Sequence, residues 1–264
     1  MNDARHTVMT EVYGWRGRIG LILPLDNVVM EPELNALALP GVSFHGLRLT
    51  VSTADAMRSQ AIETAGAMVE LGLDAVAYAC AETSFNGGSG VRKTLSQLIE
   101  NECSLPVVTA TNAMLAAAKQ LGLERIAVVT PYGQESGTAF EQTLAESGLT
   151  VVSALHRDFR LESDDPREWY VTNRQPATEV YAMARKADTK GAEAVVIAAT
   201  NLSTFGIIEQ LETDLGKPVL TSNQCILWWC LRELGLSTKR IPLGRIMTTD
   251  VDETAEELVP AGRP

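Results

Sequence analysis

Basic residues are scarce in this sequence of 264 residues, where 22 Lys and Arg stand against 33 Asp and Glu for a formal net charge of −11. Nucleic-acid binding needs a clustered basic surface, so this balance argues against a nucleic-acid partner. Histidine occurs only three times and the four cysteines form no CxxC pair, so no spacing typical of a zinc site is present. A negative net charge does not attract an anionic ligand over long distances. Such a ligand would have to be held by local hydrogen-bond donors.

Long apolar runs are also missing. No run reaches the roughly 18–20 residues needed to cross a bilayer, and the beginning of the sequence has no apolar region of the signal-peptide type. We therefore expect a cytoplasmic protein without a membrane partner. Such a location favours free thiols over disulfides for the four cysteines, which are Cys80, Cys103, Cys225 and Cys230.

The sequence does contain an internal repeat. Three stretches of the first half recur in the second: RIGLILP (18–24) as RIAVVTP (125–131), DAVAYACAETSFNGG (74–88) as EAVVIAATNLSTFG (193–206), and LPVVTATNAMLAAAKQLGL (105–123) as KPVLTSNQCILWWCLRELGL (217–236). The offset is on the order of 110 residues, which is too long for a solenoid unit and suits a lobe of several strands and helices.

Within each half, short apolar runs alternate with amphipathic stretches, which is typical of a parallel α/β sheet. The stretch MRSQAIETAGAMVELG (57–72), for example, places Ile62, Ala65 and Val69 on one helical stripe and ends on Gly72. The sequence therefore predicts two Rossmann-like lobes related by a pseudo-twofold axis, each with a four-stranded parallel sheet flanked by helices. We assign residues 15–123 with about 222–264 to one lobe and 124–221 to the other. Ligands of open α/β sheets bind at the carboxyl ends of the strands, so the active site is expected in the cleft between the lobes.

Cys80 stands where the third expected strand of the first half ends, and its counterpart in the second half is Ala199. The loop SFNGGSG follows, and we expect a helix from about Val91. Free backbone N–H groups and a helix dipole at this position would lower the pKa of the Cys80 thiol. The alternative is that Cys80 is a small buried hydrophobe, as we expect for the other three cysteines. The loop glycines match no phosphate motif and predict a tight turn that lets the backbone approach a ligand.

In each half, one residue with a neutral hydrogen-bond donor follows the first strand. Asn27 comes three residues after Pro24, and Tyr132 directly follows Pro131. Residues of these types in strand-end loops often only form turns or pack, but loops are also where ligand contacts concentrate. We therefore treat both as candidate ligand contacts at the mouth of the cleft.

Four stretches in this order carry a resemblance to a known family: GWRGRIGLILPLDNVVMEPE near the start, AYAC in the first half, VTPY opening the second, and LGKPVLTSNQ before the last helix. Together they resemble the aspartate/glutamate racemase superfamily. Within it they are most similar to maleate cis–trans isomerases, arylmalonate decarboxylases and the related ectoine-utilisation proteins. The similarity extends from about Gly14 to Leu236.

The resemblance implies two lobes, no metal, no organic cofactor, and one cysteine from each lobe on opposite faces of a small carboxylate. Cys80 matches the nucleophile of maleate isomerases, whereas Ala199 occupies the place of the second cysteine. Alanine can neither take nor deliver a proton, so two-base racemisation is excluded. We therefore expect a cofactor-independent cis–trans isomerase of a small, maleate-like dicarboxylate that acts through Cys80 alone.

The resemblance also implies a set of substrate-binding residues. Asn27 and Tyr132 match positions that hold substrate carboxylates. We add Ala81, beside the thiol, and Thr200 and Asn201, in the loop after Ala199.

Other readings stay open. The chain could be a decarboxylase of a substituted malonate with Cys80 as proton donor, or a racemase-family paralogue that binds carboxylates with weakened catalysis. Glu82 is expected to point into solvent, because a carboxylate near the thiol would raise its pKa and oppose a dianion; otherwise it serves as an unusual base. The resemblance and the apolar last helix with Trp228 and Trp229 suggest a homodimer or homotetramer.

Overall fold

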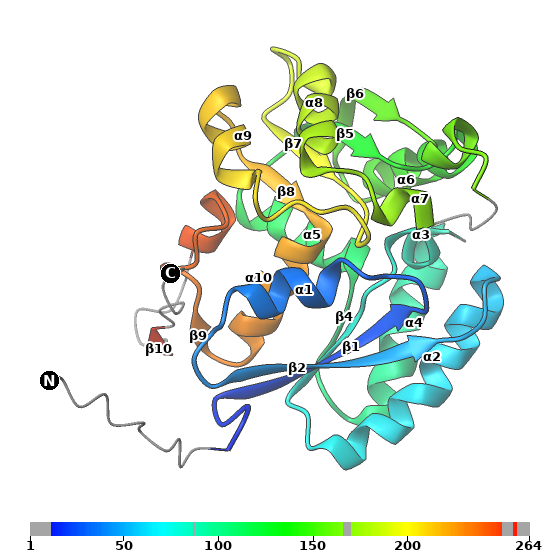
Figure 1. Ribbon diagram of the computed structural model, residues 1–264, viewed down its shortest axis with the longest axis vertical. Coiled ribbons are helices and arrows are strands. Elements are labelled where there is room, and N and C mark those ends of the chain that lie inside the picture. Colours follow the sequence, from blue (N-terminus) through cyan, green and yellow to red (C-terminus); the bar gives the residue numbers. More distant parts are fainter. Residues whose placement is uncertain (1–11, 87, 166–169, 250–255, 258–264) are drawn as a thin grey trace, which may run out of the picture.

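Two four-stranded parallel sheets, one from each half of the chain, form the framework of the protein (Figure 1). The computed structural model describes residues 12–86, 88–165, 170–249 and 256–257. The first sheet has the order β2-β1-β3-β4 and the second the order β6-β5-β7-β8. Their bounds are β1 Gly17–Pro24, β2 Val42–Leu49, β3 Ala75–Tyr78, β4 Val107–Thr109, β5 Arg125–Thr130, β6 Thr150–His156, β7 Ala194–Ile197 and β8 Val219–Thr221. The identical order confirms the predicted pair of four-stranded lobes.

Helices cover both sheets. They are α1 Met30–Ala36, α2 Ala54–Met68, α3 Ala81–Phe85, α4 Gly88–Cys103, α5 Ala110–Gln120, α6 Gln134–Glu146, α7 Tyr170–Asn173, α8 Ala177–Ala187, α9 Ile208–Leu215 and α10 Ser222–Glu233. Short 3-10 turns span Val69–Leu71, Phe159–Glu162 and Arg245–Thr248, and β9 (Leu236–Ser237) pairs with β10 (Glu256–Glu257). Among the described residues, no helix has both the length and the apolar character that a membrane span requires.

The central strands of the two sheets end in the same way. Every residue of β3 and β7 is buried, which explains their continuous apolar sequences AVAY and AVVI. Just past β3, the Ala79 N–H donates to the Ile22 carbonyl at 2.8 Å, and just past β7, the Ala198 N–H donates to the Val129 carbonyl at 2.9 Å. The next residue in each half is Cys80 or Ala199, so these two positions are structurally equivalent.

The last strand of each sheet leads into a helix at the pseudo-symmetric centre. Thr109 caps α5 by accepting from the Asn112 N–H, and Thr221 caps α10 by accepting from the Gln224 N–H. Helices α5 and α10 pack against each other, and α10 also contacts β3 and β4 of the first sheet and β8 of the second. The side chain of Trp228 in α10 is buried. The repeated sequences at 105–123 and 217–236 thus join the two lobes.

Helix α2 buries a different stripe from the predicted one. It begins at Ala54 and buries Met57, Ala61, Ala65 and Met68. Ile62 is half-buried and packs against the same core as Ala65, whereas Val69 is 50% exposed, so the predicted stripe was wrong at Val69. Both stripes have helical spacing, and the small side chains of Ala61 and Ala65 form the face that packs against the sheet and α4. Gly72 does end this segment, with a left-handed φ of 59°.

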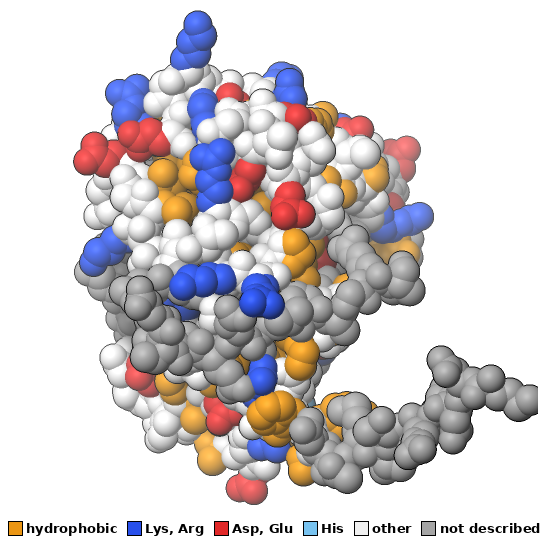
Figure 2. All heavy atoms as spheres, turned by 90° about the vertical axis from the view of Figure 1, so that its left-hand side faces the viewer, with side chains coloured by type: hydrophobic (Ala, Val, Ile, Leu, Met, Phe, Trp, Pro, Cys, Tyr) orange, Lys and Arg blue, Asp and Glu red, His pale blue; other side chains and the backbone are white. Residues whose placement is uncertain are grey.

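The face of the molecule seen in Figure 2 shows charges of both signs. In Figure 2, Lys and Arg side chains alternate with Asp and Glu side chains over the part of this face that is not grey. No continuous basic patch is visible on that part of the described surface.

Candidate active site

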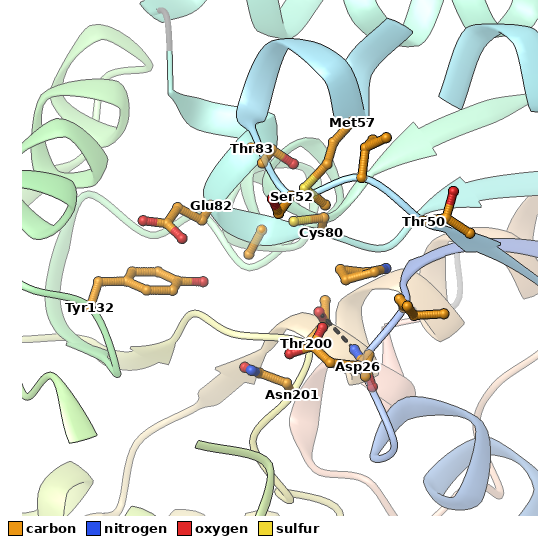
Figure 3. A pocket seen from close by; sticks show the side chains of 15 residues that line it. Asp26, Thr50, Ser52, Met57, Cys80, Glu82, Thr83, Tyr132, Thr200 and Asn201 are labelled. Atoms are coloured by element: carbon orange, nitrogen blue, oxygen red, sulfur yellow. Dashed lines mark hydrogen bonds between the residues drawn. The ribbon is translucent and has the colours of Figure 1, made fainter. Parts of the chain in front are cut away.

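A pocket of about 260 Å³ lies between the lobes, at the carboxyl ends of the strands (Figure 3). The residues that line it are Pro24, Leu25, Asp26, Asn27, Thr50, Val51, Ser52, Met57, Cys80, Ala81, Glu82, Thr83, Tyr132, Thr200 and Asn201. The structure thus brings together all six residues that the sequence analysis assigned to catalysis or substrate binding. Ala199 is buried and is not among the lining residues, although the two residues that follow it are.

Cys80 joins β3 to α3 and is 8% exposed. Figure 3 shows its sulfur directed into the pocket. The helix predicted from about Val91 is present as α4, which begins at Gly88, and a short helix that was not predicted, α3, begins at Ala81 directly after the thiol. Gly88 and Gly90 therefore belong to a helix, so the predicted loop was wrong at these two positions.

The pKa of the Cys80 thiol is raised to about 11, mainly by burial and also by the charges of Glu82 and Asp26. The hydroxyl and backbone N–H of Thr83 lower this pKa, but by less than burial raises it. The net direction is opposite to the predicted one, because desolvation outweighs the donors of a five-residue helix. At neutral pH the thiol form therefore predominates, and reactions that need the thiolate become faster as the pH rises.

Thr83 is held in place by a second buried hydroxyl. The Tyr78 hydroxyl lies 2.5 Å from the Thr83 hydroxyl, on the inner side of the pocket wall. Burial raises the pKa of Tyr78, so its phenol stays protonated and can serve as the donor of this pair. The proton of the Thr83 hydroxyl is then free to point toward the Cys80 sulfur.

Asn27 is fixed by hydrogen bonds on both ends of its amide. Its carbonyl oxygen accepts from the N–H groups of Val29 at 3.0 Å and Met30 at 3.1 Å, at the start of α1. Its amide nitrogen donates to the Thr200 hydroxyl at 3.1 Å, which in turn donates to the Ala79 carbonyl at 3.0 Å. This chain of hydrogen bonds crosses from one lobe to the other and ends on the carbonyl of Ala79, the residue before Cys80. An amide nitrogen has two N–H donors, so the second one of Asn27 is left for a ligand.

The loop that carries Asn27 is anchored from both lobes. Arg48 of β2 donates to the carbonyl of Asn27 and pairs with Glu31 of α1. From the second lobe, the Asn173 side chain of α7 donates to the Asp26 carbonyl at 3.1 Å. Asn173 does not line the pocket, and its contact positions the backbone of a loop that does.

Tyr132 projects its phenol toward the pocket from the second lobe (Figure 3). The residue is 4% exposed, and its ring lies 5.8 Å from the ring of Phe85 in α3. Burial raises its pKa well above the ordinary value, and the charges of Glu82 and Cys80 act in the same direction. The phenol therefore stays protonated and is suited to donate a hydrogen bond to an anion.

Glu82 does not point into solvent, so that prediction was wrong. It is half-buried, lines the pocket, and accepts a hydrogen bond at 2.6 Å from the Ser136 hydroxyl of α6 in the other lobe. Burial raises its pKa. The unpredicted helix α3 explains the difference, because residue 82 lies in its first turn and contacts the facing lobe there.

Several lining residues were missed by the sequence analysis. They are Asp26 beside Asn27, Thr50 and Ser52 after β2, Met57 in α2, and Thr83 in α3. Thr83 had a usable signal, since a hydroxyl three residues after a strand-end thiol falls in the first turn of a following helix. Asp26, Thr50 and Ser52 follow strand ends and Met57 lies within a helix, but together they form no spacing pattern.

The twin sheets and the thiol at their shared cleft define a class of two-lobed α/β proteins with an interlobe site. A family model described as arylmalonate decarboxylase matches residues 19–247. The chain therefore belongs to the arylmalonate decarboxylase family, as the resemblance implied. The similarity to ectoine-utilisation proteins stays a prediction.

Relatives of known function include maleate isomerases. The maleate isomerase of Nocardia farcinica is 27% identical over 254 residues, covering 90% of this chain and 98% of the relative. That of Geobacillus stearothermophilus is 25% identical over 240 residues, covering 84% and 93%. A solved structure of the Nocardia farcinica enzyme, a Cys-to-Ser variant with a covalently bound succinylcysteine intermediate, has a TM-score of 0.81 at 25% identity and covers 89% of this chain and 99% of that chain. The fold of arylmalonate decarboxylase is also shared, with a TM-score of 0.74 at 21% identity over 88% and 100% of the chains.

Proposed function

We propose that this protein is a cofactor-independent cis–trans isomerase of a small, maleate-like cis-enedioate, with Cys80 as its nucleophile. The observation that carries the proposal is the Cys80 sulfur in an interlobe pocket with the donors of Asn27 and Tyr132 around it. The relationship to maleate isomerases, one of them with a cysteine-bound intermediate, supports it.

The reaction begins when the Cys80 thiol loses its proton. The thiolate then adds to one alkene carbon, forming a C–S bond while the π electrons move onto the other carbon and its carboxylate. The former double bond is now single and rotates by half a turn. Expulsion of the thiolate breaks the C–S bond and restores the double bond in the trans geometry, so that no proton is gained or lost overall.

Donors aimed at the substrate carboxylate stabilise the charge that develops there. We assign this role to the free N–H of Asn27 and to the Tyr132 phenol, each well placed to contribute on the order of a few kcal/mol. Ala81, Thr200 and Asn201 complete the proposed contact surface. The buried methyl of Ala199 supplies no second acid or base. A two-cysteine racemase needs one group to remove a proton and another to deliver one, so that reaction is not possible here.

Conversion of maleate to fumarate, followed by proton NMR, tests the proposal. We expect turnover by the wild type and its loss, by at least about a hundredfold, in Cys80→Ala. A Cys103→Ala variant is the matched control, because it removes a buried thiol that does not line the pocket. If wild type and Cys80→Ala show the same negligible rate, the isomerase proposal fails; stabilisation by carboxylates without turnover would then identify a binding paralogue.

A second candidate function is decarboxylation of a substituted malonate with Cys80 as proton donor. The raised pKa of Cys80, about 11, favours it, since a donor must be protonated at neutral pH. In this reaction the C–CO₂ bond breaks, carbon dioxide leaves, and the resulting enediolate takes the thiol proton from the Cys80 side. Chiral analysis of the product decides, because that side predicts the enantiomer opposite to the one made by decarboxylases that use a second-lobe cysteine.

We also propose that residues 222–249 belong with the first lobe, which the contacts of α10 with β3 and β4 support. The rest of that predicted segment lies outside the described residues except for 256–257. A homodimer or homotetramer stays our prediction for the assembly.

A further inference from the structure

The pocket is acidic, which is unusual for a site that takes an anion. Asp26 and Glu82 both line it, and none of the fifteen described lining residues is Lys, Arg or His. The neutral donors of Asn27 and Tyr132 offer places for one carboxylate. A second carboxylate on the same ligand meets carboxylate side chains instead, and like charges at short range repel.

Glu82 is the carboxylate whose surroundings are best defined. Ser136 donates to its Oε1 at 2.6 Å, and among the described residues no hydrogen-bond donor contacts Oε2. Figure 3 shows the carboxylate group near the Tyr132 ring, at one end of the pocket. One oxygen of Glu82 is thus fixed by the opposite lobe, and the carboxylate lines the pocket as a hydrogen-bond acceptor.

The nearest cation does not neutralise Glu82. The charge of Arg160 acts on Glu82, but its guanidinium is held by Asp158 through two hydrogen bonds, of 2.8 and 2.7 Å. Asp158 also acts on Glu82 with a negative charge. Among the side chains that the structure describes, no ion pair joins Glu82 to a basic residue, so an incoming ligand meets an uncompensated carboxylate.

Resting on the proposed function, we infer that Glu82 sets the substrate class: the preferred ligand is not the free diacid but its half-amide, a monoanion with an N–H donor at the end that faces Glu82. The amide N–H donates to Glu82 Oε2. The single carboxylate lies at the other end, near the donors of Asn27 and the loop of Thr200. Cys80 lies between the two ends, beside the alkene carbons.

Binding of saturated analogues tests this inference without any chemistry at Cys80. Dissociation constants of succinate and its half-amide succinamate are measured by calorimetry on wild type, Glu82→Gln and Glu135→Gln. Glu135 is exposed on α6 next to Ser136, so its variant makes the same charge change outside the pocket. The Glu82→Gln side chain has the same shape, and its amide oxygen can still accept from Ser136.

We expect wild type and Glu135→Gln to bind succinamate at least about tenfold more tightly than succinate. Glu82→Gln should reduce that preference to threefold or less, mainly by binding succinate more tightly. Equal or better succinate binding by wild type, an unchanged preference in Glu82→Gln, or no binding of either ligand overturns the inference. The proposed isomerase fails separately, through absent turnover of maleate while the succinamate preference persists.

Discussion

Replacing Thr83 by Val tests how the thiol of Cys80 is tuned. The substitution keeps the shape of the side chain and removes the hydroxyl that lowers the Cys80 pKa. A hydrogen bond to a charged group contributes about 1.5–3 kcal/mol, and one pKa unit corresponds to about 1.4 kcal/mol. The Thr83 hydroxyl also bonds Tyr78, so we take the lower end, a further rise of about one pKa unit.

The assay is the rate of alkylation of Cys80 by iodoacetamide between pH 7 and 10. This reagent is uncharged, so the acidic pocket does not bias its entry. Below the pKa of about 11 the thiolate fraction grows tenfold per pH unit, and the rate should grow with it. At any pH in this range, Thr83→Val should react about tenfold more slowly than wild type.

Two controls make the result decisive. Thr83→Ser restores a hydroxyl and should recover most of the wild-type rate, while Cys80→Ala gives the background from the other three cysteines, all of which are buried. Thermal melting checks that Thr83→Val is folded, since the Tyr78 hydroxyl loses its partner. An unchanged alkylation rate in a folded Thr83→Val, or a pH profile that levels off near pH 8, would refute the reasoning.

The remaining predictions concern the two lobes. Glu33 of α1 is buried and accepts hydrogen bonds at 2.8 Å from the Phe205 N–H and from the Asn223 amide, so Glu33→Ala strands buried donors and should lower the free energy of unfolding by about 3 kcal/mol in urea titration. A decrease in the free energy of unfolding of less than about 1 kcal/mol contradicts the stabilising role of these hydrogen bonds between α1 and the second lobe. Ala199→Cys places a thiol at the pseudo-symmetric equivalent of Cys80 and should introduce solvent-deuterium exchange into a chiral monocarboxylate, measured by NMR. No exchange above wild type contradicts the assignment of Ala199 as the missing second base.

Much of the fold was predictable because matching stretches in the two halves of the sequence predict equivalent strands and helices. The repeats at 18–24 and 125–131 predicted equivalent central strands, and the hydrogen bonds that end β3 and β7 match to within 0.1 Å, at 2.8 and 2.9 Å. The equivalence of Cys80 and Ala199 follows from the same alignment. Parallel strands with continuous apolar sequences must be covered on both faces, which leaves their carboxyl ends as the place for a site.

The stripe on α2 was not predictable in the same way. Several sets of apolar and small residues at helical spacing occur between 54 and 72, and each forms a plausible inner face. Packing against α4 and the first sheet selected the stripe with Ala61 and Ala65. Local periodicity thus predicted the helix and its end at Gly72 but not its rotation.

By itself, the sequence determined the two lobes, the cleft between them, and the presence of one thiol with Asn27 and Tyr132 at strand ends, because these follow from periodicity and repetition along the chain. Only the tertiary structure decided the sign of the Cys80 pKa shift and the direction of Glu82. Both depend on desolvation and on contacts such as Ser136 with Glu82, which join residues 54 positions apart in facing lobes. No local pattern encodes how much water two folded lobes exclude when they close over a side chain.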